Sequence, residues 1–106
     1  MKTGIELIKE ERERQINEEG WTPEHDDEHK DNQLANAAAT YAMDANCRKA
    51  LTNLVYDCEL DGIPPTWPWD KEWWKPTPDD RIRELVKAGA LIAAEIERLQ
   101  RTQNGN

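Results

Sequence analysis

Apolar positions near the N-terminus are three and eight residues apart, which places them on one face of an α-helix. Ile5, Ile8 and Ile16 carry this pattern, and the residues between them are mostly Glu, Lys, Arg and Gln, which favour helix. Gly20 is a typical residue just past a helix C-terminus. The pattern therefore predicts a helix over about residues 3–19 that is exposed over most of its circumference.

A second helical region follows, and its pattern leaves two arrangements open. Thr22-Pro23 is a helix start signal, because Thr caps free amides and Pro suits the first helical position. The apolar phase slips near residues 44–46, yet neither Gly nor Pro occurs between residues 24 and 61. Residues 23–60 are therefore predicted to form either one bent helix or two abutting helices that break near 44–46.

The last third of the chain joins a segment of helix breakers to a regular helical stripe. Residues 62–77 are dense in Pro and Trp, which excludes helix and predicts an ordered loop that wraps the helices. Thr77-Pro78 repeats the helix start signal. A helix is predicted from about 78 to 101, followed by a frayed tail at 103–106. Its apolar stripe consists of Ile82, Leu85, Val86, Gly89, Ile92, Ala93, Ile96 and Leu99.

No segment alternates with period two, so we expect an all-α fold. It would be a small bundle of three to five helices, with an ordered Trp/Pro-rich loop before a long C-terminal helix. A chain of 106 residues makes a single domain, residues 1–106.

The longest apolar stretch, Ala88–Ala94, is too short to span a membrane, and no secretory signal is expected. Cys47 and Cys58 lack a CxxC pattern and are predicted to be buried thiols in a reducing cytoplasm.

The net charge of the chain limits which kinds of molecule it is expected to bind. The chain has 14 Lys and Arg against 22 Asp and Glu, a formal net charge of −8. This disfavours direct binding of duplex nucleic acid through a basic face, and it permits a metal ion or a basic protein partner. Ala-rich segments and Gly89 allow close contact between helices, and so small a chain buries few faces by itself. A homo-oligomer is therefore predicted.

The acidic face of the first predicted helix is a candidate metal site. Glu6, Glu10 and Glu13 are spaced by four and three residues, so they lie on one side of the helix. A Mg²⁺ ion would relieve their mutual repulsion, because hard cations bind carboxylate oxygens. The alternative is a solvated face whose charge is partly compensated by Arg12 and Arg14.

The only two histidines form a second candidate metal site. In a helix, His25 and His29 would share a face at i, i+4, and Asp26 and Asp27 would add carboxylate oxygens. Zn²⁺ suits the histidine pair, whereas Mg²⁺ suits only the carboxylates. The alternative is an acid-rich helix N-terminus in which the histidines have no ligand role.

The tryptophan-rich loop is a candidate binding site for a nucleotide. Tryptophan faces stack on bases, and lysines meet phosphates. The alternative is that the tryptophans only attach a Pro-rich loop to the core. The residues assigned to substrate binding are Trp69, Trp73, Trp74, Lys75 and Lys87.

Several segments together resemble a family of small proteins from bacteriophages and prophages. They read ERERQINEEGW, HDDEH, QLANAAATYA, WPWD, WWKP and LVKAGALIAAEIERL, and they cover nearly the whole chain outside residues 43–62. The expected helical layout is similar to that of MazG-like nucleotide pyrophosphohydrolases. Those enzymes hold Mg²⁺ with an ExxE motif on one helix and an ExxD motif on the next, and they split nucleoside triphosphates into monophosphate and pyrophosphate.

The resemblance implies catalytic and metal-binding roles for Glu10 and Glu13, which supply an ExxE. The second motif departs from the family, because the segment from Asp26 to His29 reads DxxH and Gln33 stands where a Glu would be expected. Two functions stay open. One is a Mg²⁺-dependent nucleotide pyrophosphohydrolase, with Mn²⁺ or Zn²⁺ as less favoured ions. The other is a non-enzymatic phage counter-defence or regulatory protein, in the cytoplasm of a bacterial host, that binds a basic protein surface or sequesters a nucleotide signal.

Overall fold

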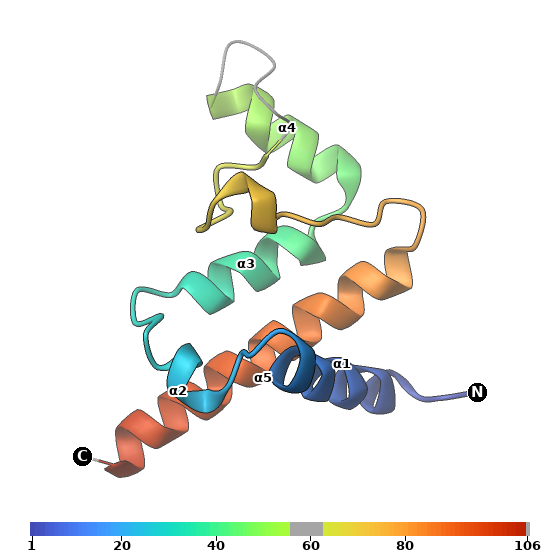
Figure 1. The fold of residues 1–106 in the computed structure, drawn as a ribbon. Helices are drawn as coiled ribbons and strands as arrows, with labels where there is room; N and C mark the ends of the chain where they lie inside the picture. The colour runs from blue at the N-terminus through green and yellow to red at the C-terminus, as the bar shows by residue number, and fades with distance from the viewer. Residues whose placement is uncertain (56–62, 106) are drawn as a thin grey trace.

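The structure, a computed structural model, describes residues 1–55 and 63–105. It contains five α-helices and one 3₁₀ helix within these residues, and no strand, so the all-α prediction is confirmed (Figure 1). In chain order the elements are α1 (Gly4–Glu18), α2 (Pro23–Asp26), α3 (Gln33–Ala42), α4 (Ala45–Val55), the 3₁₀ helix η1 (Lys71–Trp73) and α5 (Arg81–Gly105).

Helix α1 begins and ends close to the predicted residues. Thr3 and Glu6 form a capping box, in which each side chain accepts a hydrogen bond from the backbone N–H of the other, at 3.2 and 2.9 Å. Gly20 follows the helix with a φ of +74°, a left-handed conformation that suits glycine. The turn there brings the chain back, so that the N–H of Trp21 donates to the carbonyl of Gln15 at 2.9 Å.

Within the region predicted over residues 23–60, the described residues 23–55 form separate helices. Helix α2 begins at the predicted Thr22-Pro23 signal but is only one turn long. Helix α3 ends at Ala42, and the side chain of Asp44 caps α4 by accepting from the N–H of Cys47 at 2.8 Å. The prediction of a single bent helix is therefore wrong, and the break between α3 and α4 lies at residues 43–44, beside the predicted change of apolar phase.

Cys47 is exposed, which corrects the prediction of a buried thiol, whereas Cys58 lies outside the described residues.

Helix α5 is shifted toward the C-terminus relative to its prediction. Residues 77–80 form a turn, and Asp80 rather than Thr77 caps the helix, since its side chain accepts from the N–H of Arg83 at 3.0 Å. The helix continues to Gly105. The frayed tail predicted from residue 103 is therefore wrong for residues 103–105.

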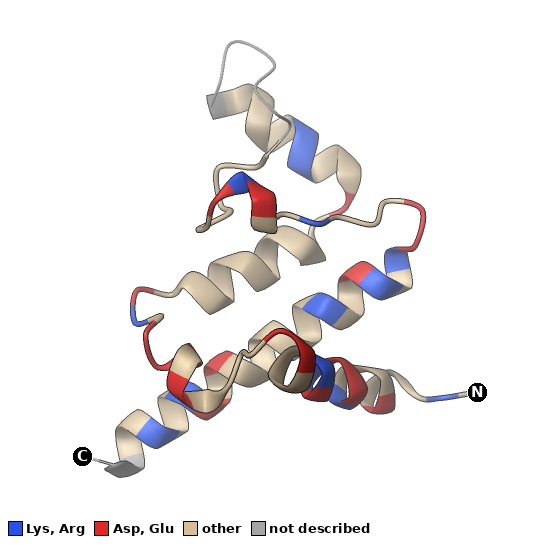
Figure 2. Cartoon of the chain, viewed as in Figure 1, with Lys and Arg blue, Asp and Glu red and all other residues tan. Residues whose placement is uncertain are grey.

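The core lies between α3 and α5, with α1 packed on another side of α5 (Figure 1). Helix α3 carries no charged residue, as Figure 2 shows, and its small side chains let the two helices approach closely. The Trp/Pro-rich segment is attached to this core by Trp67 and Trp74, whose rings lie 5.5 and 4.8 Å from that of Tyr41. The buried core consists of Leu34, Ala37, Ala38, Tyr41, Trp67, Ala88, Leu91 and Ala94.

The apolar stripe predicted along α5 lies largely outside this core. Its large members are between 42% and 67% exposed; they are Ile82, Leu85, Ile92, Ile96 and Leu99. The buried side of α5 instead includes charged residues, which are neutralised by ion pairs: Arg48 with Glu84 at 2.9 Å, and Arg98 with Glu95 at 2.7 Å. The apolar spacing thus predicts that this segment is helical, but it does not predict which side of α5 packs against the core.

None of the helices among residues 1–55 and 63–105 combines the length and the apolar character that a membrane span requires.

Candidate functional site

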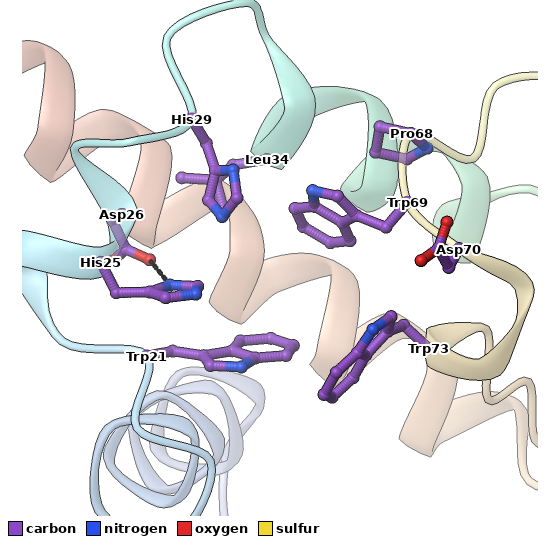
Figure 3. Close-up of a pocket in the computed structure, with 9 residues that line it drawn as sticks. All are labelled: Trp21, His25, Asp26, His29, Leu34, Pro68, Trp69, Asp70 and Trp73. Carbon is purple, nitrogen blue, oxygen red and sulfur yellow. Dashed lines mark ion pairs between the residues drawn. The ribbon is translucent and has the colours of Figure 1, made fainter.

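A pocket walled by aromatic rings lies between α2 and the Trp/Pro-rich segment (Figure 3). Its volume is about 370 Å³, which falls in the range of small-molecule binding sites. We call it the Trp pocket. Its lining residues are Trp21, His25, Asp26, His29, Leu34, Pro68, Trp69, Asp70 and Trp73.

One wall of the Trp pocket is fixed by a buried arginine of α1. The guanidinium of Arg12 donates to the carbonyl of Trp21 at 3.2 Å and to a carboxylate oxygen of Asp26 at 2.6 Å. Both charged side chains of this pair are less than a tenth exposed. The connection after α1 and the start of α2 are therefore held in one arrangement, which places Trp21 and His25 side by side.

The opposite wall comes from the Trp/Pro-rich segment. The indole N–H of Trp67 donates to the carbonyl of Asp70 at 3.2 Å, which closes this segment into a turn. Trp69 packs perpendicular to Trp67, with ring centroids 5.3 Å apart. Trp73 from η1 borders the pocket and is 47% exposed.

Aromatic rings from three parts of the chain surround the cavity, as Figure 3 shows. Trp21 and His25 are nearly parallel, at 5° between planes and 6.4 Å between centroids. His29 lies 5.1 Å from Trp69 and 5.0 Å from His25, measured between ring centroids. The pocket thus offers flat apolar faces, the surfaces on which a planar ligand stacks.

Burial shifts two titratable groups in this wall. It lowers the pKa of His29, with a further contribution from the nearby His25, so that the neutral imidazole is favoured. It also raises the pKa of Asp26, against the opposing effect of Arg12. Both shifts favour the uncharged form, as expected for a partly desolvated pocket.

A narrower cavity of about 50 Å³ adjoins the Trp pocket and shares Trp21 and Trp73 with it. We call it the Lys slot, because Lys75 and Lys87 line it together with Arg14; the carboxylates of Glu11 and Glu19 also line it. The ammonium of Lys87 donates to the carbonyl of Lys75 at 2.8 Å and lies 5.4 Å from the centroid of Tyr41. Burial lowers the pKa of Lys87, with a further contribution from the charge of Arg83.

Unpartnered polar atoms concentrate around these two cavities. Within the described part of the chain, five buried side-chain atoms have no hydrogen-bond partner: Arg12 Nε, Gln15 Oε1, His25 Nδ1, Asp26 Oδ1 and Trp69 Nε1. Four of these residues line the Trp pocket or the Lys slot, and Arg12 lies directly behind the wall. A buried polar atom without a partner is unfavourable by about 1–3 kcal/mol, so the atoms at these cavity walls call for a partner, either a water or a ligand.

Most of the predicted binding residues meet here. The structure brings His25, Asp26, His29, Trp69 and Trp73 into the Trp pocket, and Lys75 and Lys87 into the Lys slot. Trp74 instead packs against Tyr41 and under the guanidinium of Arg48, 5.2 Å from its ring centroid. That tryptophan therefore has the structural role that was the alternative for the loop.

The predicted metal ligands do not form one cluster: His25, Asp26 and His29 line the Trp pocket, whereas Glu10, Glu13 and Asp27 do not. Glu10 pairs with Lys2 at 2.5 Å and borders a groove between α1 and the start of α5, while Glu13 is exposed on α1. Asp27 accepts from Arg101 at 2.7 Å. Among the residues that the structure describes, no group of three or more His, Cys, Asp and Glu is placed to hold a metal ion.

Several residues of the site were not assigned to it from the sequence. Trp21 was not included, although its position just after Gly20 and four residues before His25 is a usable signal. Gln15, Arg14 and Tyr41 carry no such signal, because α1 and α3 look like ordinary helices in that region. Only the packing of distant segments shows them.

Comparisons with protein-family models, with curated proteins and with solved structures found no match to this chain.

Proposed function

We propose that this protein binds a nucleotide, with its base in the Trp pocket and its phosphates at the Lys slot. The observation that carries the proposal is that an aromatic cavity shares Trp21 and Trp73 with a smaller cavity, whose charged lining has two lysines and an arginine against two glutamates. A nucleotide has the same two parts, a flat base and an anionic tail. The resemblance to MazG-like proteins points to the same class of ligand.

The base would stack in the Trp pocket. Trp21, Trp69 and Trp73 present faces from two walls, and the volume of about 370 Å³ accommodates a base with part of its sugar. The unpartnered atoms Trp69 Nε1 and Asp26 Oδ1 supply one donor and one acceptor for the polar edge of a base.

The phosphates would meet the ammonium groups of Lys75 and Lys87. Because the protein as a whole carries a net charge of −8, an anionic ligand needs such a local concentration of cations. Arg14 also borders the Lys slot, but Glu11 and Glu19 already accept from its guanidinium at 2.8 and 3.0 Å. The two lysines are therefore the main phosphate-binding groups of the proposal.

A thermal-melting screen tests the proposal. Adenosine, guanosine, their 5′-mono-, di- and triphosphates and cyclic dinucleotides are added to the full chain, with and without Mg²⁺, Mn²⁺ or Zn²⁺. A ligand that binds the native state raises Tm as its concentration exceeds Kd. We expect Trp73→Ala to weaken binding by about 1–3 kcal/mol, roughly 5- to 150-fold in Kd.

Lysine variants separate the two cavities. Lys87→Gln should weaken the phosphorylated ligands and leave the nucleoside unaffected, and Lys49→Gln on the exposed side of α4 is the matched control. No Tm shift with any nucleotide would overturn the proposal. Release of pyrophosphate from a triphosphate, dependent on added metal and lost in Glu13→Gln, would support the pyrophosphohydrolase prediction in addition.

A second candidate is that the Trp pocket takes a basic side chain of a partner protein. Asp26 and Asp70 are the carboxylates of a largely aromatic lining, and the faces of tryptophan rings bind cations. A peptide rich in arginine would then raise Tm where nucleotides do not. Trp73→Ala would weaken that binding, whereas Lys87→Gln would not.

A further inference from the structure

An apolar seam runs along the outer side of α5. It consists of Ile82, Leu85, Ile92, Ile96 and Leu99, and we call it the α5 seam. With Gly89 included, successive positions are three, four, three, four and three residues apart, which is the heptad spacing of a coiled-coil seam. The aliphatic members of the seam are between 42% and 67% exposed; α3 packs on another side of the same helix, and α1 packs beside the seam and meets it at Gly89.

Helix α1 extends the seam at its glycine. The side chain of Ile8 lies where a Cβ on Gly89 would be, so it fills the gap in the row. Ile5 is one turn away on the same face of α1 and is 81% exposed. The exposed fractions of Ile5 and the α5 seam together amount to roughly 600 Å² of apolar surface, the upper end of what a monomer exposes in one patch.

That area approaches what a stable homodimer needs. A specific interface buries about 800 Å² on each partner, and side chains beside the seam would supply the remainder. Large aliphatic side chains are also more numerous on this seam than in the described core, where Leu34 and Leu91 stand among alanines. Burying the seam would therefore add to the small number of large aliphatic side chains that the described core contains.

We infer that the occupant of the α5 seam is the same seam of a second copy of this chain. Knobs-into-holes packing requires a partner helix with the same seven-residue repeat, and α5 supplies that repeat over its own length. An isologous contact of this kind closes on itself and gives a dimer. The inference does not depend on nucleotide binding, since the seam and the Trp pocket share no residue.

Sedimentation equilibrium of the full chain over a range of micromolar concentrations tests the inference. The wild-type protein should sediment with twice the 12.3 kDa chain mass. Ile96→Glu should weaken association by roughly 100-fold or more, because it buries a charge without a partner in the contact. Its far-ultraviolet circular dichroism should stay that of the wild type, since Ile96 is half exposed in the single chain.

Leu54→Glu on α4 is the matched control, because Leu54 is 83% exposed and lies outside the seam. This variant should retain the dimer mass. A monomeric wild-type protein would overturn the inference. So would a dimer that survives Ile96→Glu, or one that is lost in Leu54→Glu.

Discussion

At the scale of single residues, Gly89 combines a low helix propensity with a close contact between two helices. Glycine inside a helix is less favourable than alanine by about 1 kcal/mol. A Cβ at this position, however, would lie 2.5 Å from Cδ1 and 2.8 Å from Cγ1 of Ile8. Gly89 therefore lets α1 approach α5 closely, in agreement with the predicted close contact between helices.

Gly89→Ala should change the free energy of unfolding by less than about 0.5 kcal/mol, because displacing the flexible end of Ile8 offsets the gain in helix propensity. In an Ile8→Ala background the same change should raise it by about 0.5–1 kcal/mol, since the clash is gone and the propensity gain remains. Urea unfolding of the four proteins measures both effects. An equal effect of Gly89→Ala in the wild-type and Ile8→Ala backgrounds would contradict the contact.

His29 predicts a pH dependence of stability. Its folded pKa is lowered below the usual value of 6.5, so the unfolded chain binds the proton more readily. The resulting stability is present above about pH 6.5 and is lost as the pH falls through the lowered pKa. Tm should therefore drop between about pH 7.5 and pH 5.5, and His29→Gln should reduce that drop.

Below about pH 4.5 the pH dependence of stability comes from carboxylates rather than from His29. Glu11 and Glu84 are buried, which alone would raise their pKa values, but their arginine partners outweigh burial and the pKa of each is lowered. Stability from these pairs is present above about pH 4.5 and is lost on further acidification, equally in wild type and in His29→Gln. Parallel curves for the two proteins above pH 5.5 would contradict the assignment to His29.

At the scale of elements, one arginine fastens α4 to the rest of the molecule. Arg48 donates to the carbonyls of Thr40 and Tyr41, at 2.9 and 3.1 Å, and pairs with Glu84 of α5. Its side chain is 8% exposed. Three elements thus meet on a single guanidinium.

Arg48→Met should destabilise the protein by about 3–5 kcal/mol, because it removes the Arg48 donor from the carbonyl of Thr40 and from the buried carboxylate of Glu84, while Arg81 still donates to the carbonyl of Tyr41. Arg81 and the N–H of Thr77 still donate to Glu84, which favours the lower end of that range. Lys49→Met, next in the chain and exposed, should change stability by less than about 0.5 kcal/mol. Denaturant unfolding of both variants gives the comparison.

The elements were largely predictable, whereas their packing was not. Helices α1 and α5 follow from local signals, namely apolar spacing and end residues such as Gly20. The buried side of α5 depends on the pair between Arg48 and Glu84, which are 36 residues apart. No local pattern identifies a charge as buried when its partner is so distant.

The candidate site, too, was predictable in its residue types but not in its long-range ion pairs. The tryptophans and histidines were predicted from residue type, and the structure places most of them in one pocket. The predicted metal cluster instead depended on free carboxylates. Asp26 and Asp27 are paired with Arg12 and Arg101, which lie on helices from opposite ends of the chain.

At the scale of the whole molecule, association through the α5 seam should make thermal stability depend on protein concentration. Dimerisation coupled to folding raises Tm as concentration rises. Wild-type Tm should increase over a hundredfold range of concentration. Ile96→Glu should show a lower Tm that does not change over this range. A concentration-independent Tm in the wild type would count against the dimer.

The gathering of tryptophans in one half of the molecule has an optical consequence. Trp21, Trp69 and Trp73 border the Trp pocket, Trp67 and Trp74 pack beside it, and α5 contains none. Intrinsic fluorescence excited in the indole band therefore originates entirely around the two cavities. A ligand that enters should change emission intensity or wavelength, while contact between two α5 seams should leave the spectrum almost unaltered. Intrinsic tryptophan fluorescence should therefore distinguish ligand binding in the Trp pocket from self-association through the α5 seam, without an added label.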